Sequence, residues 1–224
     1  MKWTAYMPLR GGSKSIPGKN IRRLADRPLF AWALGAAVDS GCFDELWVGT
    51  DSAEISQAVQ AHFAGKVRLF ERSAATCTDE ASTESALLEF AAVADFDVLC
   101  TIQATSPLTR AADFQRARRQ FEEQNADSLL TAVRSHRFYW TDGGRALNYD
   151  PLKRPRRQDF AGTLMENGAF YFTRREVLSA QRCRLGGAIT VYEMAAEHAT
   201  ELDEPEDWPI IERLLGARTP HAPR

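Results

Sequence analysis

The chain has 224 residues, of which 44% are hydrophobic and 26% are charged, and this predicts one globular domain, residues 1–224, with a substantial core. Its 28 basic and 30 acidic side chains give a net charge of −2, which lacks the basic excess of a general nucleic-acid-binding protein. The four cysteines form no C-x-x-C pair and no apolar run approaches the ~18 residues of a membrane span, so we expect no zinc site, no disulfide framework, no membrane contact and a reducing, cytoplasmic compartment.

Short apolar runs and helical periods alternate along the chain. The runs predict strands at residues 3–9, 45–50, 66–70, 97–102 and 128–133. The run at 97–102 is nearly continuous, as expected of a central parallel strand that is buried on both faces. Apolar residues three and four positions apart predict the intervening helices, within residues 30–38, 55–63, 87–94 and 114–121. Further along, we expect strands at 168–173 and 188–192 and a last helix at about 205–215.

This alternation predicts an α/β fold, with a mostly parallel, Rossmann-like sheet and helices on both of its faces. Ligands of such sheets bind beyond the carboxyl ends of the strands, so the loops that follow the predicted strands are the expected site. The alternation stops at residues 135–166, which are polar, basic and aromatic. A loop of that length inside a domain indicates either a function or a surface that packs on a partner.

The strongest motif, LRGGSKSIPGKN at residues 9–20, directly follows the first predicted strand. Its paired glycines let backbone amides approach an anion closely, and it carries three cations, Arg10, Lys14 and Lys19. The spacing of its glycines is one residue too long for a G-x-x-x-x-G-K-[ST] loop, and it does not match G-x-G-x-x-G. We interpret the motif as a turn that binds phosphate groups; the alternative is a solvated basic loop.

A second motif is acidic and lies just before the last predicted helix. In extended backbone Glu201 and Asp203 point to the same side, as a site for Mg²⁺ requires. The alternative is an acidic start to a helix, because carboxylates are favourable near a helix N-terminus. We favour that alternative for Glu204, Glu206 and Asp207, and the metal site for the first two carboxylates.

Two other segments carry weaker signals. Gln103 leaves the central predicted strand at the point where a ligand would lie, although ordinary turn chemistry explains it equally well. The basic cluster KRPRR at residues 153–157 taken alone indicates a nuclear import signal or a solvated patch, so the nucleus is the alternative compartment.

With these motifs the chain resembles the acylneuraminate cytidylyltransferases, also called CMP-sialic acid synthetases. The resemblance spans nearly the whole sequence and includes residues 10–20, 50–51, 102–107, 153–159, 166–172 and 201–203. The segments 153–159 and 166–172 resemble the vertebrate catalytic domain in particular, and we expect this chain to lack the additional C-terminal domain of the vertebrate enzymes.

The resemblance implies an enzyme that forms CMP-sialic acid and pyrophosphate from CTP and a 2-keto nonulosonic acid such as N-acetylneuraminate. It also implies Mg²⁺ as cofactor and a homodimer in which residues 135–166 form a protruding dimerisation arm. The implied catalytic residues are Arg10, Lys19 and Asp203, and no general base is assigned. The implied nucleotide-binding residues are Leu9, Gly11, Gly12, Ser13, Asn20, Arg72, Ser82 and Thr83.

The implied sugar-binding residues are Gln103, Asn167, Tyr171 and, reaching the partner's site from the arm, Arg157. Glu201 and Asp203 are the implied metal ligands. The family usually has aspartate where this chain has Glu201, and the longer side chain leaves direct or water-mediated metal binding open.

Three other functions stay open at this stage. The first is a synthetase for a related sugar acid, of the KDN, legionaminate, pseudaminate or KDO type. The second is a non-catalytic nucleotide-binding protein, which the substitution at Glu201 motivates. The third, RNA binding through residues 153–157, is disfavoured by the nearly neutral total charge.

Overall fold

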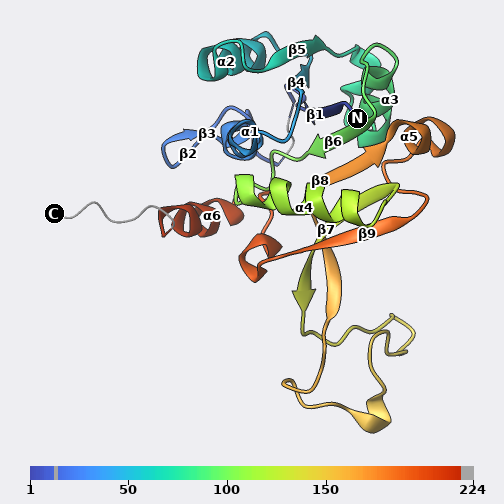
Figure 1. Cartoon of the computed structure of the whole chain (residues 1–224). Coiled ribbons are helices and arrows are strands. Elements are labelled where there is room, and N and C mark those ends of the chain that lie inside the picture. The colour runs from blue at the N-terminus through green and yellow to red at the C-terminus, as the bar shows by residue number, and fades with distance from the viewer. Residues whose placement is uncertain (13–14, 218–224) are drawn as a thin grey trace.

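A seven-stranded sheet with the order β5-β4-β1-β6-β8-β7-β9 forms the centre of the computed structural model, which describes residues 1–12 and 15–217 (Figure 1). Its strands are β1 (Trp3–Pro8), β4 (Glu45–Thr50), β5 (Arg68–Glu71), β6 (Val98–Ile102), β7 (Ser128–Ser135), β8 (Thr163–Arg174) and β9 (Ile189–Met194). Neighbouring strands are parallel except where β8 pairs with β6 and β7. The predicted Rossmann-like, mostly parallel sheet is therefore confirmed.

Alternate residues of each strand point to opposite faces of the sheet. Both faces carry apolar side chains, and helices cover both. From β1, Ala5 and Met7 enter one core and Tyr6 enters the other. The larger core packs against α1 (Leu29–Ser40), α2 (Ala53–Phe63) and α4 (Ala111–Glu123), and the smaller one against α3 (Thr83–Ala91) and α5 (Arg175–Gln181). All five residues of β6 are buried, as the continuous apolar run predicts.

A third, smaller cluster lies beside the main core and holds α6 (Asp207–Gly216). Here Ile16 from the glycine-rich motif and Leu202 from the acidic motif are both fully buried, together with Ile211 of α6. The short hairpin of β2 (Arg23–Leu24) and β3 (Arg27–Pro28) contributes Leu24 to the same cluster. This packing fixes the first motif against the second.

The structure differs from the sequence expectation at three elements. The strand expected at 168–173 begins earlier, at Thr163, and runs antiparallel to its neighbours. The short α5 and the β2–β3 hairpin were not predicted, because neither is long enough to show a periodic pattern. None of the helices in residues 1–12 and 15–217 has the length and apolar character needed to span a bilayer.

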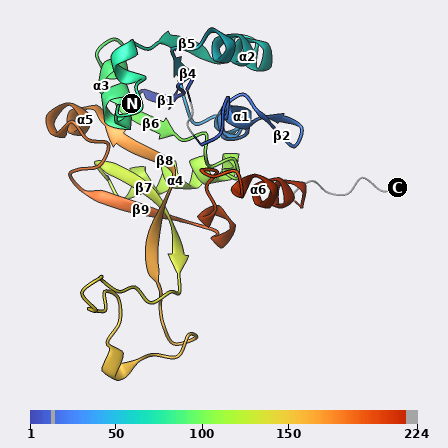
Figure 2. The same ribbon diagram turned by 180° about the vertical axis from the view of Figure 1, so that it is seen from behind.

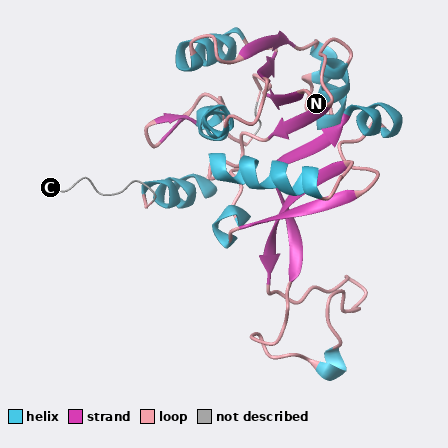
Figure 3. Ribbon diagram, viewed as in Figure 1, coloured by secondary structure: helices cyan, strands magenta, loops and turns pink. Residues whose placement is uncertain are grey.

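An arm projects from the far end of the β7–β8 pair, away from the rest of the sheet (Figures 1 and 2). It is mostly loop with one short 3-10 helix, η2 (Pro151–Lys153) (Figure 3). The arm has its own small aromatic cluster, in which the rings of Phe138 and Tyr149 stack 4.1 Å apart and the Arg154 guanidinium lies 4.6 Å from the Phe138 ring centroid. Arg154 is thus engaged within the arm.

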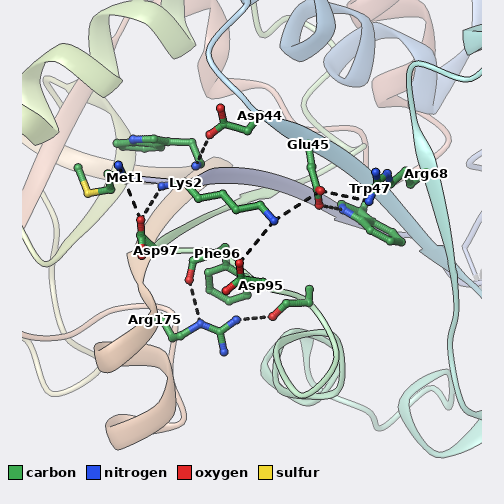
Figure 4. A network of polar contacts seen from close by, with 12 residues as sticks. Met1, Lys2, Asp44, Glu45, Trp47, Arg68, Asp95, Phe96, Asp97 and Arg175 are labelled. Carbon is green, nitrogen blue, oxygen red and sulfur yellow. Dashed lines mark hydrogen bonds and ion pairs between the residues drawn. The ribbon is translucent and has the colours of Figure 1, made fainter.

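Polar contacts hold the amino ends of the strands, opposite the edge where ligands are expected (Figure 4). The Arg175 side chain donates to the carbonyl oxygens of Phe96 at 2.8 Å, Ala91 at 3.2 Å and Ala94. Trp47 and Arg68 donate to the carboxylate of Glu45, and these bonds hold its pKa below the usual range. Arg175 therefore ties the end of α3 to the start of β6.

We expect Arg175→Met to lower the free energy of unfolding by about 1–3 kcal/mol, because three backbone carbonyls lose a charged donor while the apolar stem is kept. Urea titration followed by circular dichroism measures this change. The control is Arg119→Met at an exposed position of α4, which should stay within about 0.5 kcal/mol of the wild type. Equal effects of the two substitutions would contradict the assigned role.

Candidate functional site

A cavity of about 530 Å³ opens at the carboxyl ends of β1, β5 and β6. This is the edge of the sheet at which the strand pattern predicts ligand binding. Much of the predicted site lines the cavity: Arg10, Gly12, Lys19, Asn20, Arg72, Ser82, Thr83, Gln103 and Asp203. These residues come from five separate parts of the chain, and their convergence is a property of the folded sheet.

The turn after β1 is held by hydrogen bonds to the end of β4 and to the turn that follows it. The Leu9 amide donates to the Gly49 carbonyl at 2.7 Å, and the Gly11 amide donates to Asp51 Oδ1 at 2.8 Å. Asn20 Nδ2 closes the turn by donating to the Arg10 carbonyl at 3.1 Å. The Leu9 side chain is buried in the core, so only the backbone of this residue can meet a ligand.

Gly11 lies against Ser52 and outside the cavity wall, and a Cβ built at Gly11 would approach Ser52 Cβ to 3.0 Å. A glycine at this position lets the backbone of the first turn pass close to Ser52 in the neighbouring turn. Ser13 and Lys14, the remaining predicted residues of this motif, lie outside the described residues.

The second half of the glycine-rich motif is bound to the acidic motif. Lys19 Nζ donates to the Leu202 carbonyl at 2.9 Å and lies 3.5 Å from Asp203 Oδ1, while Ser15 Oγ donates to the Asp203 carbonyl at 2.9 Å. Asp207 at the start of α6 accepts from the amides of Asp203 and Glu204. A cation and a carboxylate thus face the cavity side by side, and Glu204, interpreted above as a helix start, also lines it.

Arg72 forms part of the opposite wall. Arg72 is 8% exposed and its guanidinium donates to the Thr76 carbonyl, and its Nε has no hydrogen-bond partner within residues 1–12 and 15–217. Glu89 of α3 holds the same loop by accepting from the Ser73 amide at 2.7 Å and from the Thr76 hydroxyl. These bonds outweigh the effect of burial and lower the pKa of Glu89, so the carboxylate is the stable form.

The N-terminus of α3 also faces the cavity. The Ser82 hydroxyl caps this helix by accepting from the Ser85 amide at 3.1 Å, and Ser82 and Thr83 both line the wall. A helix N-terminus presents free amides and a partial positive charge. Together with the arginines and Lys19, it makes the cavity suited to a phosphorylated ligand.

The predicted sugar-binding residues are not brought together in one place. Gln103 lines the cavity, and its backbone amide donates to the Ala169 carbonyl at 3.1 Å. Asn167 is 1% exposed and donates to the His198 carbonyl at 3.0 Å, away from the cavity wall. Tyr171 is also buried, donates to the Glu166 carboxylate and carries the Arg184 guanidinium 4.7 Å from its ring centroid. Arg157 lies on the arm, in a separate basic cavity of about 710 Å³ at its base.

Glu201 and Asp203 differ in their surroundings. Asp203 is exposed in the cavity, whereas Glu201 is half-buried beside Gly168. The φ of 61° at Gly168 favours glycine, and a Cβ built there would lie only 3.0 Å from Glu201 Oε2. Burial, Asp203 and Glu166 raise the pKa of Glu201 to about 7, against the opposing effect of Lys19. No cluster of three or more His, Cys, Asp or Glu ligands is present in the described part of the chain.

These residues fit Mg²⁺ better than a cation that needs a complete protein cage. Mg²⁺ is commonly bound by one or two carboxylates together with substrate phosphates and water. Asp203 meets that requirement from the cavity wall, and a cation beside Glu201 would relieve the repulsion that the crowded carboxylates create.

Several residues that shape the cavity were not singled out from the sequence. Asp79 pairs with Arg10 across the cavity, and Glu89 fixes the loop of Arg72. Each is one carboxylate in a chain with 30 acidic residues. Only its position in the fold distinguishes it, so the sequence carries no local signal for these roles.

Comparison with known proteins shows which sequences and folds this chain is similar to. A sequence model of the family described as cytidylyltransferase matches residues 5–214. N-acylneuraminate cytidylyltransferase A of Danio rerio is 39% identical over 220 residues, which are 95% of this chain and 50% of that protein. The enzyme of the same name from Oncorhynchus mykiss is 40% identical over 219 residues, and this chain again spans about half of its length. A pseudaminic acid cytidylyltransferase of Campylobacter jejuni is 29% identical over 183 residues, or 77% of this chain and 78% of that protein.

Two solved structures share the fold at low sequence identity. CMP:2-keto-3-deoxy-manno-octonic acid synthetase complexed with CTP superposes with a TM-score of 0.72 and 23% identity, covering 97% of this chain and 99% of that one. The 4-diphosphocytidyl-2C-methyl-D-erythritol synthase of Anaerococcus prevotii gives a TM-score of 0.69 with 12% identity and 96% coverage of both chains. These likenesses support the Rossmann-like assignment.

Proposed function

The chain belongs to the cytidylyltransferase family, and we propose that it is an enzyme that transfers the CMP group of CTP to a nonulosonic acid such as N-acetylneuraminate and releases pyrophosphate. The observation that carries this proposal is the joint placement of Arg10, Lys19 and Asp203 on one cavity at the carboxyl edge of the sheet. The 39–40% identity to vertebrate N-acylneuraminate cytidylyltransferases supports the choice of sugar acid.

The cavity has the volume and the polarity of a nucleotide site. Its 530 Å³ falls within the range of small-molecule pockets. Arg10 and Lys19 approach from the β1 turn, and Arg72 and the N-terminus of α3 from the opposite wall. In the proposed complex Arg10 and Lys19 hold the triphosphate, and Gly12 and Asn20 line its path.

The proposed reaction is an in-line substitution at the α-phosphorus of CTP. The anomeric hydroxyl oxygen of the sugar acid forms the new bond to phosphorus, the bond to the bridging oxygen of the pyrophosphate breaks, and the hydroxyl proton passes to solvent. Such chemistry depends mainly on positioning and on neutralising charge. Arg10 and Lys19 stabilise the negative charge that grows on the leaving pyrophosphate.

Asp203 and Glu201 are the residues that would hold Mg²⁺ in this proposal. Bound there, the cation supplies charge neutralisation on the triphosphate. Lys19 keeps Asp203 turned toward the cavity, because its ammonium contacts Asp203 Oδ1 while also bonding the Leu202 carbonyl. The side chain of Glu201 lies beside Gly168 and close enough to Asp203 for their charges to interact, so Glu201 is the second carboxylate of this proposal.

A related sugar acid is the second candidate substrate. The similarity to a pseudaminic acid cytidylyltransferase, over 78% of that protein, favours this alternative. A non-catalytic nucleotide-binding protein is the third candidate, motivated by Glu201 in place of aspartate.

We propose a homodimer whose arms carry Arg157 into the partner's cavity. The arm projects from the domain and exposes large apolar side chains, at Trp140, Leu147, Leu152, Leu164 and Met165. Such an exposed apolar surface is typical of an interface with another chain. Within its own chain Arg157 lines a cavity other than the one that holds Arg10. We propose a cytoplasmic location, with the nucleus as the alternative that residues 153–157 raise, and no nucleic-acid partner.

We expect CTP and a mixture of nonulosonic acids to give pyrophosphate and a product with the mass of a CMP-sugar acid, identified by mass spectrometry.

Arg10→Ala should reduce the rate on the order of a hundredfold, equivalent to about 3 kcal/mol of lost transition-state stabilisation, with an unchanged circular dichroism spectrum. Absence of any CMP-sugar product from the wild type would support the non-catalytic candidate, and full activity in Arg10→Ala would contradict the assignment of the turn.

The metal assignment predicts that activity requires Mg²⁺ and that Asp203→Asn loses both the rate and its dependence on Mg²⁺ concentration. The amide keeps the size of the side chain but removes the charge that attracts the cation. Activity measured across a magnesium titration tests this. Glu206→Gln, an exposed position that does not line the cavity, is the control and should keep the wild-type titration. A normal titration in Asp203→Asn would count against the site.

The dimer predicts rescue between two inactive variants. In a mixed dimer, the Arg157→Ala chain forms a cavity with an intact Arg10. The Arg10→Ala chain supplies that cavity with an intact Arg157 from its arm. An equal mixture that exchanges subunits should therefore regain about a quarter of the wild-type activity, because half of the dimers are mixed and each has one complete site. Recovery no greater than the average of the two variants would show that Arg157 does not act across a dimer.

A further inference from the structure

An ion pair joins two walls of the cavity. The first wall is the turn after β1, which carries Arg10. The second is the loop between β5 and α3, residues 72–82, which carries Asp79. Arg10 Nη1 donates to Asp79 Oδ1 at 2.6 Å and to the Thr78 carbonyl at 3.3 Å, although Arg10 and Asp79 are 69 residues apart in the sequence. We call this contact the Arg10–Asp79 pair.

The second wall is fixed at its other end. Glu89 of α3 accepts from the Ser73 amide and the Thr76 hydroxyl, so the start of the loop is held against α3. The side chains of the Arg10–Asp79 pair are more accessible, with exposed fractions of 34% and 43%. An exposed pair of this kind can be exchanged at small cost, because water screens the charges that separate.

The pair has a chemical consequence for ligand binding. Both Arg10 and Asp79 line the cavity, and the Asp79 carboxylate occupies a donor of the guanidinium that is proposed to bind the triphosphate. A phosphate oxygen and a carboxylate oxygen seek the same N–H groups, and guanidinium binds both in the same fork geometry. A triphosphate at this position would also lie close to the negative charge of Asp79 and be repelled by it.

We propose that Asp79 is a built-in competitor of the ligand's phosphates: it holds Arg10 in the empty cavity and must release it when the triphosphate binds. This inference rests on the proposed function. It makes Asp79 a specificity-determining residue, because a ligand has to offer Arg10 enough negative charge to replace the carboxylate. It also means that the loop at residues 77–81 loses a tie to the opposite wall when the nucleotide is bound.

The test is the affinity for CTP in the absence of a sugar acid, measured by isothermal titration calorimetry. Asp79→Asn should bind CTP about three- to tenfold more tightly than the wild type, because the amide competes weakly and no longer repels phosphate. The matched control is Glu80→Gln, which removes the same charge from the neighbouring exposed residue outside the cavity wall and should leave the affinity unchanged.

An unchanged or weaker affinity in Asp79→Asn, with CTP binding intact in the wild type, would overturn the competitor role. Absence of CTP binding to the wild type would instead reject the proposed function itself, so the two failures are distinguishable.

A double-mutant cycle separates the competitor role from a general effect of charge. With inorganic tripolyphosphate as the probe, Asp79→Asn should strengthen binding more in the wild-type background than in the Arg10→Gln background. In the second background the guanidinium for which the two anions compete is absent, and only the repulsion by Asp79 is relieved. Equal strengthening in both backgrounds would show that Asp79 acts only by long-range repulsion and would overturn the proposal.

Discussion

The attachment of the glycine-rich turn to the acidic segment is the constraint on which the rest of the site depends. Lys19 donates to the Leu202 carbonyl across 183 positions of sequence, and Ser15 donates to the Asp203 carbonyl. Beneath these bonds Ile16 and Leu202 share one buried cluster with α6. Because buried apolar contacts and hydrogen bonds act together, the cation of the first motif and the carboxylate of the second stay on one wall of the cavity. In the proposed complex, the nucleotide and Mg²⁺ would therefore meet a site whose wall is already in place before either binds.

The sheet supplies the other wall by the same logic. Parallel β1, β5 and β6 end at one edge, so Arg10, Arg72 and Gln103 follow their strands into the same cavity. The antiparallel β8 contributes no residue of the predicted site to this cavity. Its central residues lie between β6 and β7, and Asn167 and Tyr171 are buried there. The same strand, extended to Thr163, carries the arm outward. The reversal of one strand thus separates the part of the molecule that forms the cavity from the part that reaches outward.

Charges in the cavity are balanced within the chain. Arg10 is paired with Asp79, Lys19 contacts Asp203, and the Arg72 guanidinium bonds a backbone carbonyl. In the proposed function, a ligand replaces some of these contacts, and this favours a molecule with several negative charges. The affinity for a triphosphate would then be a difference between two sets of ion pairs, so that the carboxylates of the wall contribute to selectivity together with the cations.

The local patterns of the sequence determined the strands and most of the helices, the mostly parallel α/β class and the loops that carry the site, because hydrophobic periodicity and glycine-rich turns depend on neighbouring residues. They also identified Arg10, Lys19 and Asp203, which the structure places on one cavity. Only the tertiary structure decided the direction of β8, the burial of Asn167 and Tyr171, and the pairing of Arg10 with Asp79. Those features arise from contacts between segments far apart in the chain, and no local pattern in one sequence records which distant side chains will meet.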